Sequence, residues 1–127
     1  MKTDLTIFLA EDDADDVLFF KKAMADLLSS ANITILFDGE ELIKLLETDT
    51  ILPDIIFLDL NMPKKNGFEC LKEIKNNSLW KQIKTIILST TSDNDQINKC
   101  YFLGADKFLT KAVDYSEFKL NLWQCLP

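Results

Sequence analysis

The segment DIIFLDLNMPKKNG, residues 54–67, decides the fold. Residues 55–58 form a continuous apolar run, which is typical of a parallel strand buried on both faces. Asp59 ends the run, and a loop with Pro63 and Gly67 leads into an amphipathic stretch. The apolar side chains of that stretch are Phe68, Leu71 and Ile74. The segment therefore predicts a buried strand followed by a helix.

The same pattern of an apolar run followed by an amphipathic stretch recurs along the chain. Further strands are predicted at residues 5–10, 33–37, 85–88 and 107–109. Further helices are predicted at residues 14–29, 40–47 and 115–125, and another is expected to bury Ile97, Tyr101 and Phe102 and to end before Gly104. This alternation predicts an α/β fold, a doubly wound parallel sheet of five strands flanked by five helices. Ligands of such sheets bind at the carboxyl ends of the strands.

The composition limits the class of function. A chain of 127 residues with 47% hydrophobic residues suits one domain, and a net charge of −7 argues against a nucleic-acid partner. Three cysteines without a CxxC pair predict neither disulfides nor a zinc site. Because the sequence has no histidine, it excludes Ser-His-Asp triads and histidine-ligated zinc.

The first residues, MKTDLTIFLAEDD, hold only a short apolar stretch interrupted by Asp4 and Thr6. This stretch is too short and too polar for a signal peptide or a membrane span. We therefore expect a cytoplasmic protein without a membrane partner.

Carboxylates gather where the first predicted strand ends. Glu11 and Asp12 follow it directly, and their mutual repulsion would be relieved by a divalent cation. Hard oxygen ligands suit Mg²⁺, whereas an EF-hand calcium loop needs a glycine and a final glutamate that are missing here. Asp13, Asp15 and Asp16 come next, and they form either an ordinary solvated helix start or part of the same site.

Asp59 directly follows the third predicted strand. Taken alone, it is either a turn residue or a site residue. If the first and third strands are neighbours, Asp59 joins Glu11 and Asp12 in one pocket, an arrangement that is costly without a metal ion or protons. A carboxylate in such a pocket can act as a nucleophile and form an acyl phosphate.

The fourth and fifth predicted strands end in Ser89 and Lys111. The run Ser89, Thr90, Thr91 and Ser92 either caps the next helix or supplies a hydroxyl to a phosphoryl group, and Ser89 lies nearest the strand. Lys111 is either a surface lysine or the partner of Asp59, pairing with the carboxylate at rest and with the phosphate afterwards. These residue types supply all parts of a phosphoryl-transfer site.

The sequence resembles the receiver domain of bacterial two-component response regulators over residues 7–123. Four segments carry the resemblance, each at a predicted strand end: IFLAEDD, DIIFLDLNMPKKNG, TIILSTT and GADKFLTKA. The resemblance implies a flavodoxin-like fold with strand order 2-1-3-4-5, and a signalling phosphoprotein rather than an enzyme.

The resemblance also implies roles for single residues. Asp59 would be the phosphoacceptor, and Mg²⁺ would be held by Glu11, Asp12, Asp59 and the backbone carbonyl of Asn61. Ser89 would be the switch hydroxyl and Phe108 the aromatic switch residue, with plain core packing as the alternative for Phe108. The phosphoryl group would contact Thr90 and Lys111. Asn61 and Thr91 would tune dephosphorylation.

Ala112 departs from the family pattern. Family members usually have proline after the lysine, often with a cis peptide, whereas Ala112 follows Lys111 here. A cis bond before a non-proline residue costs roughly 2.5 to 4 kcal/mol, so a trans peptide is favoured and Lys111 would be held differently.

The resemblance also suggests partners. A histidine kinase or a phosphotransfer protein would donate the phosphoryl group, and homodimers could form on phosphorylation. Because the sequence ends after the last predicted helix, we expect no output domain. A target protein would then read the face of the fourth helix, fifth strand and fifth helix, including Tyr101, Phe108 and Tyr115.

Two alternatives remain. The first is a degenerate receiver that binds partners without phosphorylation, as Ala112 and the choice of Ser89 over threonine would allow. The second is an aspartyl-phosphate hydrolase of the haloacid dehalogenase type, which needs a general acid two residues after the nucleophile. Asn61 occupies that position here and cannot serve as a general acid.

Overall fold

The computed structural model describes residues 4–28, 30–48 and 51–127. Five parallel strands form one sheet in the order β2-β1-β3-β4-β5. The strands are β1 (Leu5–Ala10), β2 (Ala31–Leu36), β3 (Ile55–Asp59), β4 (Lys84–Ser89) and β5 (Lys107–Thr110). The helices are α1 (Ala14–Leu27), α2 (Gly39–Thr48), α3 (Gly67–Asn76), α4 (Asn94–Phe102) and α5 (Tyr115–Cys125). The predicted fold class and strand order are therefore confirmed.

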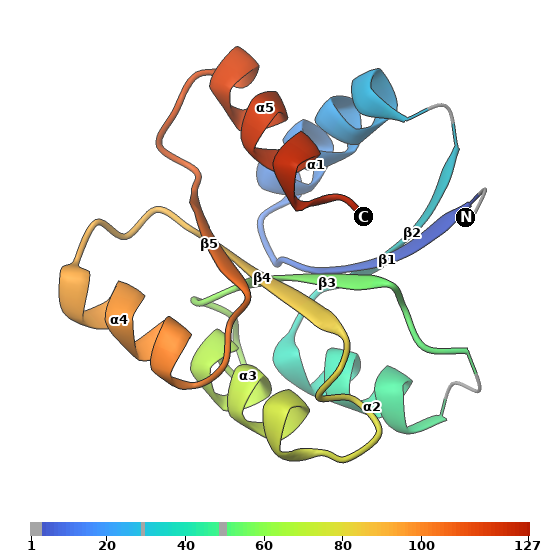
Figure 1. The fold of residues 1–127 in the computed structure, drawn as a ribbon, viewed down its shortest axis with the longest axis vertical. Coiled ribbons are helices and arrows are strands. Elements are labelled where there is room, and N and C mark those ends of the chain that lie inside the picture. The colour runs from blue at the N-terminus through green and yellow to red at the C-terminus, as the bar shows by residue number, and fades with distance from the viewer. Residues whose placement is uncertain (1–3, 29, 49–50) are drawn as a thin grey trace.

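Helices cover both faces of the sheet, so that two cores form (Figure 1). The face under α1 and α5 buries Ile7 and Leu9 of β1, and the face under α2, α3 and α4 buries Phe8 and Ala10. Successive residues of a strand point to opposite faces, so a continuous apolar run fills both cores. No helix within the described ranges is long and apolar enough to cross a membrane.

The second strand differs from its prediction of residues 33–37. β2 lies at the edge of the sheet and alternates between exposed and half-buried residues before Leu36. Phe37 falls outside the strand, and its side chain is 54% exposed. An edge strand has a neighbour on one side only, which explains why its apolar signal is weaker than that of β3.

Two helix predictions were wrong in part. The first helix ends at Leu27, because Leu28 already has an extended backbone, and the predicted last residue, Ser29, lies outside the described residues. The fourth helix does not bury Phe102, whose side chain is 87% exposed, and Tyr101 is also exposed. Its buried residue is Cys100.

Side-chain caps start four of the helices. Asp13, Asp93 and Asp114 accept hydrogen bonds from the first amides of α1, α4 and α5. Asn66 and Glu69 form a reciprocal capping box at α3. All four of these caps lie in loops at the carboxyl ends of strands, and they fix the backbone around the site described next.

Candidate functional site

Three carboxylates converge at the carboxyl ends of β1 and β3. Glu11 directly follows β1, Asp59 is the last residue of β3, and these two strands pair with each other. Carboxylate oxygens of Glu11, Asp12 and Asp59 all lie within 4.8 Å of one another. Glu11 and Asp59 are buried, with 1% and 6% exposure, whereas Asp12 is exposed. The pairing of β1 with β3 thus brings Glu11, Asp12 and Asp59 together, as expected if these strands are neighbours.

The backbone around these acids is held closely. The amide of Glu11 donates to the carbonyl of Leu36, and the amide of Gly67 donates to the carbonyl of Leu60, each at 2.9 Å. A Cβ atom on Gly67 would lie 2.4 Å from the backbone oxygen of Asp59, so only glycine fits at this start of α3. Within the same loop, Lys64 adopts a positive φ of 66°.

Lys111 follows β5 and brings one positive charge to the acids. Its Nζ lies 2.5 Å from Glu11 Oε1, 2.9 Å from Asp16 Oδ2 and 3.5 Å from Asp59 Oδ1. The predicted pair of Lys111 with Asp59 is present, but Glu11 and Asp16 hold the ammonium more closely. The Lys111–Ala112 peptide is trans, since the described part of the chain has no cis peptide bond.

Sequence reasoning did not single out Asp16 as a site residue. It was one of three acids that a solvated helix start also explains. A usable signal existed in its spacing, because Asp16 lies four residues before the buried Phe20 and so shares its helix face. That face looks toward the sheet and toward Lys111.

Burial perturbs the titration of the site. The pKa of Glu11 is raised to about 7, first by burial and then by the charge of Asp59, although Lys111 opposes the shift. Burial also raises the pKa of Asp59, against the opposing effect of Lys111. For Lys111, burial lowers the pKa, but the hydrogen bonds to Glu11 and Asp16 outweigh it and the net shift is upward. One lysine therefore does not compensate the buried acids fully.

The hydroxyl run after β4 is organised by side-chain hydrogen bonds. Ser89 Oγ is fully buried and accepts from the amide of Thr91, and Thr91 Oγ1 accepts from the amide of Asp93. Asp93, and no member of the hydroxyl run, caps α4. Thr90 is exposed and Thr91 is half-buried. Ser89 thus lies at the strand end as predicted, held there without capping a helix.

Two other predicted residues lie around the site. Asn61, two residues after Asp59, is exposed in the loop that follows β3. Phe108 of β5 is half-buried against the core on the α2, α3 and α4 side, and its amide donates to the hydroxyl of Tyr101 at 3.0 Å.

The carboxylate cluster fits a hard divalent cation. Its donors are oxygens, as Mg²⁺ or Mn²⁺ requires, and their charge exceeds that of Lys111. Burial is the main cause of the raised pKa of Glu11, and the negative charge of Asp59 adds to it. The residues present therefore suit a bound cation.

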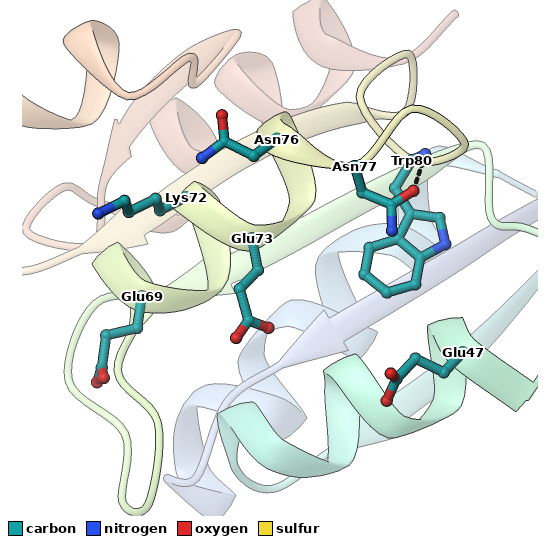
Figure 2. A pocket seen from close by; sticks show the side chains of 7 residues that line it. All are labelled: Glu47, Glu69, Lys72, Glu73, Asn76, Asn77 and Trp80. Carbon is teal, nitrogen blue, oxygen red and sulfur yellow. Dashed lines mark hydrogen bonds between the residues drawn. The ribbon is translucent and has the colours of Figure 1, made fainter.

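A cavity of about 670 Å³ lies away from these acids, along α2, α3 and the loop that follows α3 (Figure 2). Trp80 forms one wall, with Glu47 on α2 and Glu69 and Glu73 on α3. Glu69 already caps α3, and Glu73 pairs with Lys65 at 2.5 Å. The cavity lacks a convergent set of free polar groups, so the strand-end acids remain the candidate site.

Comparison with known proteins agrees with this geometry. A sequence profile of the response regulator receiver domain matches residues 7–122. Response regulator Rcp1 from Synechocystis sp. is 32% identical over 120 residues, which cover 90% of this chain and 82% of Rcp1. The transcriptional regulatory protein CiaR from Streptococcus pneumoniae is 34% identical over 93% of this chain, but the chain spans only 50% of CiaR.

Solved structures give the same result. The phosphorylated cyanobacterial phytochrome response regulator RcpA matches with a TM-score of 0.87 and 32% identity, over 95% of this chain and 90% of that one. The Mn²⁺-bound form of Rcp1 matches with a TM-score of 0.85 and 29% identity, over 94% of this chain and 90% of that one.

Proposed function

The chain belongs to the response regulator receiver family, and we propose that it is a signalling switch that accepts a phosphoryl group on Asp59. The convergence of Glu11, Asp12, Asp59 and Lys111 at one edge of the sheet is the observation that carries this proposal. The carboxylates can bind a cation, and Lys111 is itself a cation. Together they can neutralise the negative charge of a phosphoryl group during its transfer.

The donor in this proposal is a phosphohistidine of a histidine kinase or of a phosphotransfer protein. A lone pair of an Asp59 oxygen attacks phosphorus as the bond between phosphorus and the imidazole nitrogen breaks. That bond pair stays on the imidazole, which leaves as a neutral ring when its other nitrogen carries a proton. The product is an acyl phosphate on Asp59.

Mg²⁺ is the proposed cofactor, and a Mn²⁺-bound structure of the relative Rcp1 supports a divalent cation. Glu11, Asp12 and Asp59 would hold it through carboxylate oxygens and Asn61 through its backbone carbonyl. When bound, the cation would neutralise charge on the phosphoryl oxygens and orient them. Lys111 would bind a phosphoryl oxygen from the other side.

The chain's own residues would then pass on the signal. The hydroxyl of Ser89 would donate a hydrogen bond to the phosphoryl group, and Thr90 would be a further contact. Phe108 would then move inward. Asn61 and Thr91 would control how readily water attacks the acyl phosphate. An unidentified target protein would read the change on the face of α4, β5 and α5, and homodimers could form there.

Intact mass spectrometry tests this proposal. The protein is incubated with Mg²⁺ and acetyl phosphate, and one added phosphoryl group is expected on the wild type. Asp59→Asn should carry none, and the matched control Asp15→Asn should be modified like the wild type, because Asp15 is exposed on α1. An unmodified wild type, or an equal adduct on Asp59→Asn, would refute the proposal.

A second candidate function is protein binding without phosphorylation. Two observations favour it: Ala112 stands where proline is usual, and Lys111 lies nearer to Glu11 and Asp16 than to Asp59. In this case Asp59→Ala would leave binding to the target protein unchanged. Weaker binding of Asp59→Ala, together with tighter binding of the phosphorylated wild type, would exclude it.

A further inference from the structure

Lys111 is shared between carboxylates from three separate elements. Glu11 follows β1, Asp59 ends β3 and Asp16 belongs to the first turn of α1. An ammonium group has three N–H donors. The 2.9 Å to Asp16 is the distance of a charge-assisted hydrogen bond, and the contact with Glu11 is shorter still. The 3.5 Å to Asp59 is that of a looser ion pair.

We propose that Asp16 is a positioning residue that holds the Lys111 ammonium against the start of α1 and so keeps Asp59 available. This inference rests on the proposed function and deepens it. The carboxylate of Asp16 takes up a donor that would otherwise turn to Asp59. Asp59 then keeps its lone pairs for a cation and for an incoming phosphoryl group.

The local structure fixes Asp16 well enough for this role. Its amide donates to Asp13 Oδ1 at 3.0 Å, which ties it to the cap of α1. One turn later, Phe20 is buried and packs edge-on against Phe57 of β3. The Asp16 side chain is only 41% exposed. Both its backbone and its helix face are therefore anchored.

The space around the lysine limits where the ammonium can go. A cavity of about 40 Å³ lies beside it, lined by Glu11, Asp16 and Lys111 together with the apolar side chains of Leu9, Phe19, Phe20, Leu88 and Phe118. The apolar side chains offer no hydrogen-bond acceptor. The carboxylates are therefore the side-chain acceptors that this lining provides for the ammonium. Removing the charge of Asp16 weakens its hold on the ammonium, which then moves toward Asp59.

Competition at Asp59 gives the experiment its readout. A Lys111–Asp59 hydrogen bond occupies an oxygen that Mg²⁺ would also use, so Asp16→Asn should weaken Mg²⁺ binding. Asp15→Asn is the matched control, since it removes the same charge from the adjacent residue without touching Lys111. Isothermal titration of each protein with MgCl₂ measures the affinity directly.

We expect Asp16→Asn to bind Mg²⁺ about fivefold more weakly than Asp15→Asn. This ratio corresponds to the free energy that a partly exposed ion pair typically contributes. In a Lys111→Met background the two substitutions should give affinities within about twofold, because no ammonium remains to be positioned. Raising Mg²⁺ should restore the rate at which Asp16→Asn is phosphorylated by acetyl phosphate. Asp16→Ser is tested in parallel, with folding checked by circular dichroism.

Equal affinities of the Asp16 and Asp15 variants would overturn the proposal. A fivefold gap that persists in the Lys111→Met background would also overturn it, because Asp16 would then act through its field alone. A phosphorylation defect that saturating Mg²⁺ does not repair would indicate structural damage instead and count against it. Absence of the Asp59 adduct on the wild type would refute the proposed function, whereas equal Mg²⁺ affinities would refute only the role of Asp16.

Discussion

Replacement of Glu11 by glutamine is expected to stabilise the metal-free protein by about 3 kcal/mol at pH 8. Glutamine keeps the shape of the side chain and a carbonyl oxygen for Lys111, but it cannot ionise. In the wild type the pKa of Glu11 rises from 4.5 to about 7, chiefly because burial penalises the charged form. The charged form therefore opposes folding, and the variant lacks it.

The sign follows from linkage. Below pH 4.5 the folded and unfolded chains are both protonated at Glu11, and the stability due to the raised pKa is fully present. Between pH 4.5 and about 7 the unfolded chain gives up its proton while the folded protein keeps it, and each pH unit costs about 1.4 kcal/mol. This stability is lost once the pH has passed the folded pKa.

Urea unfolding in EDTA, followed by circular dichroism between pH 4.5 and 8, measures the effect. The gap between Glu11→Gln and the wild type should be near zero at the acid end and grow to about 3 kcal/mol. Glu47→Gln, at an exposed position of α2, should stay within about 0.5 kcal/mol of the wild type. A gap that does not grow with pH, or a variant that is less stable at pH 8, would refute the reasoning.

Magnesium should reduce the difference in stability between Glu11→Gln and the wild type. At about 100 times its dissociation constant, Mg²⁺ should stabilise the wild type by about 2.7 kcal/mol. Glu11→Gln has lost one proposed ligand and should gain less, so the gap at pH 8 should narrow. An equal gain in both proteins would mean that Glu11 is not a ligand.

Three further substitutions test the backbone and the far end of the sheet. Gly67→Ala should destabilise the protein by about 2 to 3 kcal/mol and suppress the Asp59 adduct, because the new Cβ overlaps the backbone of Asp59; unchanged urea midpoints would contradict this. Lys64→Gly should stabilise the protein by about 1 kcal/mol by relieving a φ of 66°. The ion pair that it removes, with Asp38 at 3.8 Å, is long, and its lysine is exposed; a lower melting temperature would count against this prediction. Lys75→Met should lower the free energy of unfolding by about 2 kcal/mol, because the Lys75 ammonium donates to the carbonyls of Lys81 and Ile83 and to Asp106. An unchanged stability in urea would refute this prediction.

The strand ends were predictable because buried parallel strands leave a plain signal. The apolar run of β3 ends sharply at Asp59, and β1 ends in the same way at Glu11. Parallel strands bring their carboxyl ends to one edge, so these acids were predicted to meet if the first and third strands are neighbours, which the family resemblance implied. The sequence did not distinguish buried Glu11 from exposed Asp12, which depends on how the chain turns into α1.

The errors arose where the signal was short. In α4, an inner stripe of Ile97, Cys100 and Leu103 at spacings of three competes with the larger side chains of Tyr101 and Phe102. Over nine residues the periodicity does not fix which stripe faces inward, and the larger side chains were chosen wrongly. Asp16 escaped notice for a different reason, because its partner Lys111 is 95 residues away.

The hydrogen bond from the amide of Thr91 to Ser89 Oγ leaves the hydroxyl proton of Ser89 free to be donated. It uses a lone pair of Ser89 Oγ, while no residue in the described ranges accepts the hydroxyl proton of Ser89. A hydroxyl can accept and donate at once. Ser89 can therefore offer its proton to an anion at Asp59 while it still anchors the turn at Thr91, whereas Ser89→Ala would lose the donor and the anchor together.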